Sequence, residues 1–417
     1  MDQPDNLQSA LARMEPYLPW YRLWINGNGA GGGPVRSLQD LPLVTASILE
    51  AYYYAENNPL ADRPELNCYR TSGTSSGIRK AIYYSDWDEE QYVRIKEDIF
   101  RAILGTGRYR TALADMGTGH AEATAVEVFR RLGMEVESIS FRLPIQEHLA
   151  KLESFRPEVL YTMPSILNRI VLESPDPSSY GIRHVVLVGE IASRAWIRET
   201  ARQLGLEPEQ ITDTYGSIEV GTIAYYSHEH GRYVLAEGLS AEGMGSEELG
   251  EGLEPLPDAQ EKVLVLTSLV REAFPALRYV TYDVVRDLRP ILVDGRWTPS
   301  FHSLVKRIGP DLKHGEKISI YDVETVVYRH LSEAGFRVKV TGNALTVAIA
   351  SPLATDEVLH SIRHDLEHLI PEIGMMIQAR LLDGIRVIRV KAEELTSGGS
   401  IKGKKLFYEQ SGESSET

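Results

Sequence analysis

Between residues 110 and 188, apolar segments of strand length alternate with longer segments of helical spacing, and this alternation constrains the fold more than any other feature. Strands are predicted at Arg110–Met116, Val136–Ser140, Val159–Tyr161 and His184–Val188, and helices at Ala121–Leu132, Ile145–Ser154 and Ser165–Leu172. Strands that alternate with helices form βαβ units and a mostly parallel sheet. Ligands of such sheets bind at the carboxyl ends of the strands, so we expect the functional site there.

After about residue 307 the pattern changes to that of a small α+β unit. Helices are predicted at 322–334 and 355–369, and strands at 338–340, 345–349 and 385–390. The expected fold class is α/β, with a large multi-layer amino-terminal domain over residues 1–306. Residues 307–417 are expected to form a small, mobile α+β domain that could fold alone.

Charge and cysteine content exclude several classes of function. The formal net charge is 44 − 59 = −15, which disfavours nucleic-acid binding because phosphate neutralisation needs a basic surface. The single cysteine, Cys68, excludes an internal disulfide and a cysteine-cluster zinc site within one chain. Neither a secretory signal nor an apolar run of membrane-spanning length is visible, so we expect a cytoplasmic protein with no membrane partner. The oligomeric state stays open, a dimer included.

The segment Arg70–Lys80 is the most informative local feature. It places hydroxyl residues around two glycines and ends in two cations, a composition that can wrap a polyphosphate. It lies between short strand-like runs and differs from a Walker A loop, which has four residues between its glycines followed by Gly-Lys-Ser/Thr. Its candidate phosphate-binding residues are Thr71, Ser72, Gly73, Thr74, Ser75, Ser76, Gly77 and Lys80.

Further segments follow in a characteristic order along the chain. They are Asp213–Glu219, with a glycine, an aromatic residue and a carboxylate; Leu277–Asp283, a strand-like run that ends in Asp; Arg307–Ser319, which joins the two units; and the basic glycine-rich loop Ser397–Lys405. Together they resemble the adenylate-forming superfamily that contains acyl-CoA synthetases. The greatest similarity is to its compact phenylacetate–CoA ligase group, which includes adenylating enzymes of phenazine tailoring. Ser37–Thr45 is similar to the entry segment of that group, and Tyr161–Ser165 to a strand end that lines its acyl pocket.

The resemblance implies that a carboxylate attacks the α-phosphate of ATP, giving an acyl-adenylate and pyrophosphate. Glu219 would ligate Mg²⁺, Tyr215 would stack on adenine beside Gly216 and Ser217, and Asp283 and Arg307 would bind the ribose. Lys404, or Lys402 in a shifted register, would bridge the carboxylate and the α-phosphate. The acyl group would then pass to a thiol such as coenzyme A or a carrier protein, with an amine as a further possible acceptor.

For the acid itself the resemblance implies a flat aryl compound. The candidate pocket residues are His120, Tyr161, Met163, Pro164, Gly189 and Glu190. The small domain would rotate after adenylation, with the hinge near Arg307–Lys313.

Two departures from the family pattern keep alternatives open. Three residues, instead of two, separate Gly73 from Gly77, a variant that is similar to acyl-acid amido synthetases. Ile218 stands where the family has a threonine, which motivates a non-catalytic nucleotide-binding module as the second hypothesis. An acyl-protein synthetase is a third, but Cys68 lies in the wrong region for its acyl-transfer cysteine.

Overall fold

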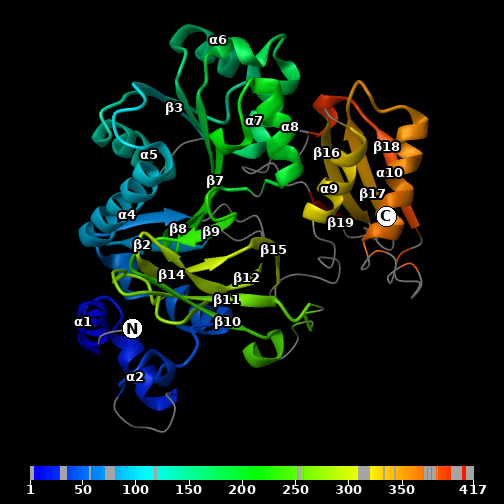
Figure 1. Ribbon diagram of the computed structural model, residues 1–417. Helices are drawn as coiled ribbons and strands as arrows, with labels where there is room; N and C mark the ends of the chain where they lie inside the picture. Colours follow the sequence, from blue (N-terminus) through cyan, green and yellow to red (C-terminus); the bar gives the residue numbers. More distant parts are fainter. Residues whose placement is uncertain are drawn as a thin grey trace, which may run out of the picture.

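The computed structural model describes most of the chain. The described residues are 4–28, 35–55, 58–70, 80–116, 120–190, 192–250, 253, 255–256, 258–308, 320–331, 334–341, 344–370, 373, 377, 382, 384–395 and 406–409. Two bodies of unequal size are visible, with the small one beside α8 of the large one (Figure 1).

A nine-stranded sheet forms the centre of the large body, in the order β13-β14-β9-β8-β7-β6-β5-β3-β4. Its parallel half consists of β3 (Thr111–Asp115), β4 (Glu135–Ile139), β5 (Val159–Thr162), β6 (His184–Leu187) and β7 (Ile211–Ser217). Its antiparallel half consists of β8 (Gly221–Ser227), β9 (Arg232–Leu235), β13 (Arg289–Val293) and β14 (Arg296–Phe301). The α/β class is therefore confirmed, while the antiparallel half was not foreseen.

Helices cover both faces of the parallel half. They are α4 (Asp86–Leu104), α5 (His120–Arg131), α6 (Ile145–Phe155), α7 (Pro164–Glu173) and α8 (Arg194–Leu204). Ala112 and Ala114 pack with α4 and α5, whereas Leu113 packs with α6, α7 and α8, because successive strand residues face opposite sides. Every strand and helix predicted between residues 110 and 188 is present, with ends shifted by one residue at most.

A second sheet, of order β10-β11-β12-β15, lies below the first. Its strands are β10 (Leu239–Met244), β11 (Glu261–Ser268), β12 (Tyr279–Arg286) and β15 (Ser303–Arg307).

The hairpin β1 (Asn67–Arg70) and β2 (Ala81–Tyr84) forms as predicted on either side of the phosphate-loop candidate. The amino-terminal part is helical, with α1 (Pro4–Met14), α2 (Pro19–Asn28), α3 (Ala46–Ile48) and the helical turns Leu38–Asp40, Leu49–Tyr53 and Pro59–Asp62. Val44 N donates to Arg278 O, just before β12, and Val280 N of β12 donates to Val44 O, so the amino-terminal segment is tied to the second sheet.

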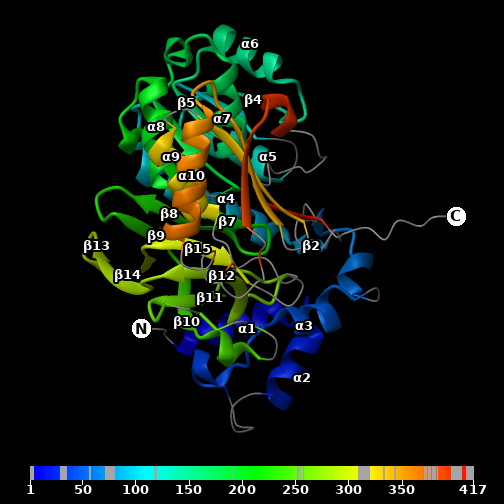
Figure 2. The same cartoon turned by 90° about the vertical axis from the view of Figure 1, so that its right-hand side faces the viewer.

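The small body has its own hydrophobic cluster and its own sheet, β18-β17-β16-β19. Its elements are α9 (Ile320–His330), β16 (Gly335–Thr341), β17 (Ala344–Ala350), α10 (Asp356–Leu369), β18 (Gly384–Arg389) and β19 (Leu406–Glu409). α9 ends at His330, four residues earlier than the end of the helix predicted at 322–334. The buried Glu324 of α9 accepts a hydrogen bond from Ser193 N at the start of α8, at 2.9 Å. Figure 2 shows α9 lying between α8 and α10.

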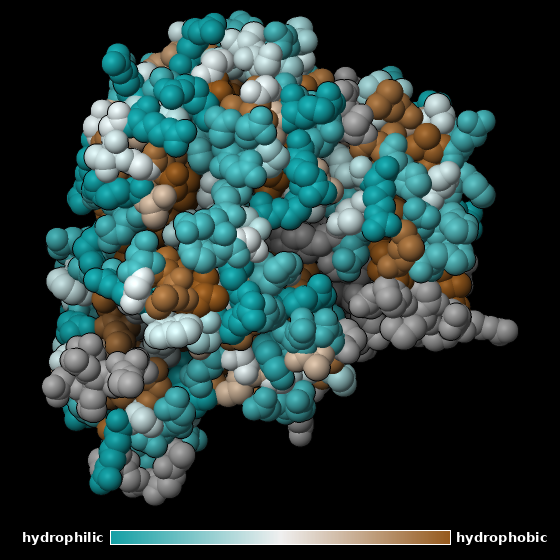
Figure 3. Space-filling model, viewed as in Figure 1, coloured by the Kyte–Doolittle hydropathy of each residue, from teal (hydrophilic) through white to brown (hydrophobic). Residues whose placement is uncertain are grey.

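Hydrophilic residues dominate the face drawn in Figure 3, and hydrophobic residues there form small, separate groups. Among the described helices, none is both long enough and apolar enough to cross a membrane.

Candidate functional site

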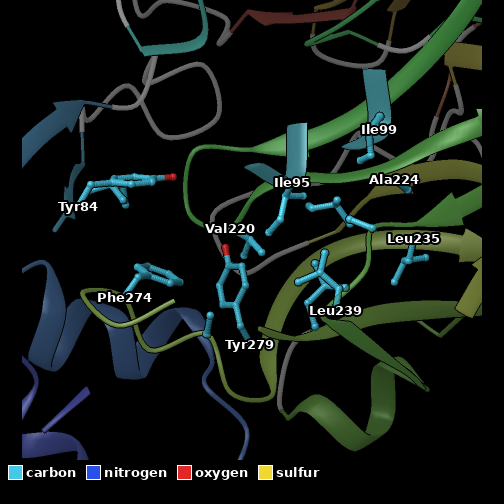
Figure 4. Close-up of a cluster of buried hydrophobic side chains, with 14 of the residues drawn as sticks. Tyr84, Ile95, Ile99, Val220, Ala224, Leu235, Leu239, Phe274 and Tyr279 are labelled. Carbon is cyan, nitrogen blue, oxygen red and sulfur yellow. The ribbon is translucent and has the colours of Figure 1, made fainter. Parts of the chain in front are cut away.

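The turn that joins β7 to β8 carries Glu219 and is built from close backbone contacts. A Cβ on Gly216 would lie 2.8 Å from the carbonyl oxygen of Gly221. Gly221 has a φ of +99°, and a Cβ there would lie 2.9 Å from the Tyr92 ring. Val220 anchors the turn in the apolar cluster beside Tyr279 (Figure 4). These contacts fix the position of the Glu219 backbone.

The variant Gly221→Ala tests this turn. Because alanine would adopt an unfavourable φ and also contact Tyr92, we expect the free energy of unfolding to fall by about 1–3 kcal/mol. Chemical denaturation measures this change. Gly231→Ala is the matched control, since Gly231 also has a positive φ but its nearest contact is at 3.8 Å. Equal losses in the two variants would contradict a special role for the contact with Tyr92.

Tyr215, Asp283 and Arg307 meet where β7 approaches β12 and β15. The Tyr215 hydroxyl donates to Asp283 Oδ2 at 2.6 Å, and Arg307 Nε lies 3.9 Å from Asp283 Oδ1. Burial, followed by the charge of Asp283, holds the pKa of Tyr215 well above its usual value. The charge of Asp283 in turn raises the pKa of Arg307. Three residues that are distant in the sequence thus form one polar group.

Asp283 does not end its strand as predicted but lies inside β12, next to an irregularity. The residue before it, Tyr282, has a φ of +61°, and the pairing of β12 with β11 shifts its register between Val263 and Val265. The Thr281 hydroxyl accepts from Asp283 N at 3.1 Å. Strained backbone of this kind is common where a strand directs a side chain to a functional position.

Lys80, the last residue of the phosphate-loop candidate, approaches the same region. Its Nζ lies 4.8 Å from the centre of the Tyr54 ring and 2.5 Å from Glu50 Oε1. Burial, and then the Glu219 carboxylate, raise the pKa of Tyr54, which places Glu219 near that ring. Glu219 likewise contributes to the raised pKa of Arg307, after Asp283 and Tyr279. Lys80 and Glu219 therefore both lie near the Tyr54 ring, and Glu219 also lies near the Tyr215 group.

Glu219 suits a metal ion that takes most of its ligands from phosphate and water. Its carboxylate makes no hydrogen bond or ion pair with the rest of the described chain, where it is half-buried. No cluster of three or more potential ligands occurs within the described ranges. A lone free carboxylate fits Mg²⁺, which binds through one or two carboxylates plus substrate phosphates.

Several predicted site residues lie outside the described part of the chain. They are Thr71, Ser72, Gly73, Thr74, Ser75, Ser76, Gly77, Lys402 and Lys404. The hinge segment beyond Ile308 lies outside it as well.

His120 begins α5 and contacts the partly buried Glu89. Its Nε2 lies 2.6 Å from Glu89 Oε2, while Glu89 Oε1 accepts from the Tyr69 hydroxyl at 2.7 Å. Burial alone would raise the pKa of Glu89, but the His120 and Tyr69 contacts outweigh it, so the pKa is lowered. The His120 ring also packs 4.8 Å from that of Tyr84, whose hydroxyl donates to Ile218 O at 2.5 Å. His120 thus adjoins the Glu219 turn.

The other predicted pocket residues have different structural positions. Tyr161 is 2% exposed and packs edge-on against Phe100 in the core. Met163 packs against Gly189, which has a φ of +79°. Pro164 starts α7, and Glu190 accepts from Ser165 N and Oγ at the start of that helix.

Sequence reasoning missed the buried ion pair of Asp88 and Arg271. This pair underlies the Glu219 turn, because Arg271 also bonds to the Glu219 backbone. Arg271 Nη1 contacts Asp88 Oδ2, and Arg271 Nε donates to Glu219 O at 3.0 Å. It also missed Lys96, a buried lysine of α4. Ser85 and Asp88 do carry the Ser-x-x-acid signature of a capped helix start, but nothing local indicates Arg271 as the partner.

Comparison with known proteins gives consistent matches. The family described as “Fumarate--diaminopropanoate ligase C-terminal domain” matches residues 313–393. The Fumarate--(S)-2,3-diaminopropanoate ligase of Enterobacter agglomerans is 34% identical over 95% of this chain and 97% of its own length. The phenylacetate-coenzyme A ligase of Thermus thermophilus is 24% identical over 68% of this chain and 64% of its own length. Among solved structures, 2-hydroxyisobutyryl-CoA ligase in the postadenylation state matches with a TM-score of 0.74, at 15% identity, over 97% of this chain and 88% of that one.

Proposed function

This chain belongs to the adenylate-forming family of ligases that includes fumarate–diaminopropanoate ligase and the phenylacetate–CoA ligases, and we propose that it activates a small carboxylic acid with ATP and joins it to an amine. The observation that carries the proposal is the convergence of Tyr215, Asp283, Arg307 and the free Glu219 carboxylate beside Lys80. This set combines an aromatic ring for the base, a carboxylate that could accept from ribose hydroxyls, two cations, and a second carboxylate that could bind a metal ion.

In the proposed adenylation step, these residues mainly position ATP and offset its charge. The nucleoside would lie along Tyr215, with its ribose hydroxyls donating to the Asp283 oxygen that Tyr215 leaves free. Mg²⁺, held by Glu219, would supply charge neutralisation at the phosphates. Lys80 and the loop before it would bind the outer phosphates, while Lys404, or Lys402, would bridge the acid and the α-phosphate. The small domain, residues 307–417, would then move to admit the acceptor.

An amine is favoured as acceptor by the relative that shares 34% identity over nearly the whole of both chains, because its name describes a ligase of fumarate and a diamino acid. The variant glycine spacing of the Gly73–Gly77 loop, which resembles that of acyl-acid amido synthetases, points the same way. The thiol acceptor and aryl acid expected from the sequence are less favoured. Tyr161, one of the candidate pocket residues, packs in the core.

The test is acid-dependent pyrophosphate release with ATP and Mg²⁺, over a panel of short mono- and dicarboxylic, aryl and fatty acids. The loaded enzyme is then offered amino acids, diamino acids or coenzyme A, and the product is identified by mass spectrometry. An amide product supports the proposal, whereas a thioester alone would restore the thiol ligase. ATP binding without pyrophosphate release from any acid would favour a non-catalytic binding module, and Ile218→Thr would then be the first variant to make.

A further inference from the structure

Lys80 and Glu50 form an ion pair at the edge of the candidate site. Glu50 Oε1 lies 2.5 Å from Lys80 Nζ, and the glutamate side chain is 55% exposed, against 21% for the lysine. The same ammonium group lies 4.8 Å from the centre of the Tyr54 ring, which is partly buried. The lysine is therefore held over an aromatic ring by a carboxylate that solvent and ligands can reach.

A short π-helical turn, Leu49–Tyr53, carries Glu50 and is followed by Tyr54. Backbone hydrogen bonds hold this turn, because Leu49 N donates to Thr45 O at 3.1 Å and Tyr54 N donates to Leu49 O at 2.7 Å. The Glu50 carboxylate takes no part in these bonds, so it can change its partner without unfolding the turn. Short π-helical segments are rare in proteins and often lie at functional sites.

The ion pair brings a second carboxylate to a region that already contains Glu219. After burial, the charges of Glu219 and, more weakly, of Glu50 raise the pKa of Tyr54, so both carboxylates lie near its hydroxyl. In the proposed reaction Mg²⁺ would balance Glu219 at the phosphates. Glu50 instead occupies the cation that the outer phosphates of ATP would use. A phosphate group that reaches Lys80 must therefore displace Glu50 or share the ammonium group with it.

We propose that Glu50 competes with the outer phosphates of ATP, and with pyrophosphate, for Lys80, so that it raises the KM for ATP and promotes the release of pyrophosphate. This inference rests on the proposed function, in which Lys80 binds those phosphates. When ATP binds, the ammonium group exchanges the Glu50 carboxylate for phosphate oxygens. When pyrophosphate leaves, the ion pair forms again. Glu50 takes part in no covalent step and acts through Lys80 as a positioning residue.

Glu50→Gln tests the competition, because glutamine keeps the size of the side chain and removes its charge. We expect the KM for ATP and the inhibition constant of pyrophosphate to fall together by about two- to fivefold, which corresponds to the loss of an exposed ion pair. Both constants are measured through acid-dependent formation of AMP, since pyrophosphate is the added inhibitor. The affinity for AMP itself, measured by calorimetry, should not change because AMP lacks the outer phosphates.

Glu65→Gln is the matched control. Glu65 is 56% exposed and lies 2.7 Å from Arg63, whose guanidinium lies 4.6 Å from the centre of the Tyr17 ring. This pair has nearly the same exposed glutamate and the same order of carboxylate, cation and tyrosine ring, but it includes no residue of the candidate site. Glu65→Gln should therefore leave the constants for ATP, pyrophosphate and AMP unchanged.

Two further measurements show whether Glu50 acts through Lys80. In a Lys80→Met background, Glu50→Gln should no longer tighten ATP binding, because the cation for which it competes is absent. Raising the NaCl concentration from about 0.1 to 1 M should reduce the difference between wild-type protein and Glu50→Gln, because salt screens an exposed ion pair. Tightening that persists undiminished in the Lys80→Met background would overturn the inference.

Other results would also contradict it. A higher KM for ATP in Glu50→Gln would show that Glu50 orients Lys80 towards the phosphates, and equal changes for ATP and AMP would show a general structural effect. A raised Mg²⁺ requirement would make Glu50 a metal ligand. If no acid yields AMP, the proposed function fails, and ATP binding measured by calorimetry decides the inference. Tighter binding in Glu50→Gln but not in Glu65→Gln supports it, whereas equal or absent binding overturns it.

Discussion

Replacing Asp88 with alanine is expected to lower the free energy of unfolding by about 3–5 kcal/mol, the typical cost of leaving one partner of a buried ion pair unpaired. Asp88 is fully buried, and Arg271 is 4% exposed. Asp88 Oδ1 accepts from Glu272 N at 2.8 Å, and its Oδ2 accepts from Ala273 N at 3.1 Å as well as from Arg271. The substitution therefore removes both the counter-charge of Arg271 and the acceptor of these two backbone N–H groups.

The effect should reach the candidate site, because Arg271 connects the pair to it. Arg271 Nη2 donates to Tyr83 O at 2.7 Å, its Nε donates to Glu219 O, and its guanidinium lies 3.7 Å from the centre of the Tyr84 ring. Without Asp88, the buried Arg271 guanidinium would move towards solvent, and its contacts with Tyr83, Glu219 and Tyr84 would weaken. Whatever activity the variant retains should therefore depend more strongly on Mg²⁺ concentration.

Urea denaturation followed by circular dichroism measures the loss. Glu127→Ala is the matched control, because its ion pair with Arg131 is half-exposed and should contribute no more than about 1 kcal/mol. Asp88→Ala combined with Arg271→Leu should recover part of the loss, since the double variant leaves no buried charge unpaired. A loss in Asp88→Ala as small as that in Glu127→Ala would show that the pair does not stabilise the fold.

The parallel half of the fold could be predicted because each element there carries a local signal. Val159–Thr162 is a short apolar run, and Pro164 starts the helix after it, so strand and helix are both readable from neighbouring residues. The antiparallel half was not foreseen, although its pairs β7–β8, β8–β9 and β13–β14 join neighbouring segments; only the pairing of β9 with β14 brings distant segments together. Asp283 shows the difference. Its residue type indicated a binding role, but its place inside β12 depends on a register shift that no local pattern specifies.

The same reasoning explains which site residues were found. Tyr215, Glu219 and Asp283 stand in motifs with recognisable order, and the structure brings them into one region. Lys96 and Arg271 stand in no motif. Lys96 occupies a helix that also carries exposed charges, and only tertiary packing shows that this one lysine faces α5 and the core. That it pairs with no carboxylate among the described residues is a property of the folded chain and has no counterpart in the sequence.

Replacing Glu219 with glutamine is expected to lower acid-dependent pyrophosphate release by about 10²–10³-fold, the range found when one charge-stabilising group is removed from an active site. Glutamine keeps the size of the side chain but removes the charge that would hold Mg²⁺ at the phosphates. The backbone contacts of the turn, through Val220 and the Arg271 bond to Glu219 O, do not involve the carboxylate. The melting temperature should therefore stay near that of wild-type protein.

Rates measured against Mg²⁺ concentration separate a metal role from a structural one. If Glu219 binds the ion, the variant should need more Mg²⁺ for half-maximal rate, and its rate at saturating Mg²⁺ should recover in part. Glu229→Gln, in the next turn after β8, is the control and should leave both values unchanged. A Glu219→Gln enzyme with full activity at ordinary Mg²⁺ would remove Glu219 from the proposed metal site. Because the Tyr215–Asp283–Arg307 group does not depend on that carboxylate, ATP binding would then have to be explained by this group and Lys80 alone.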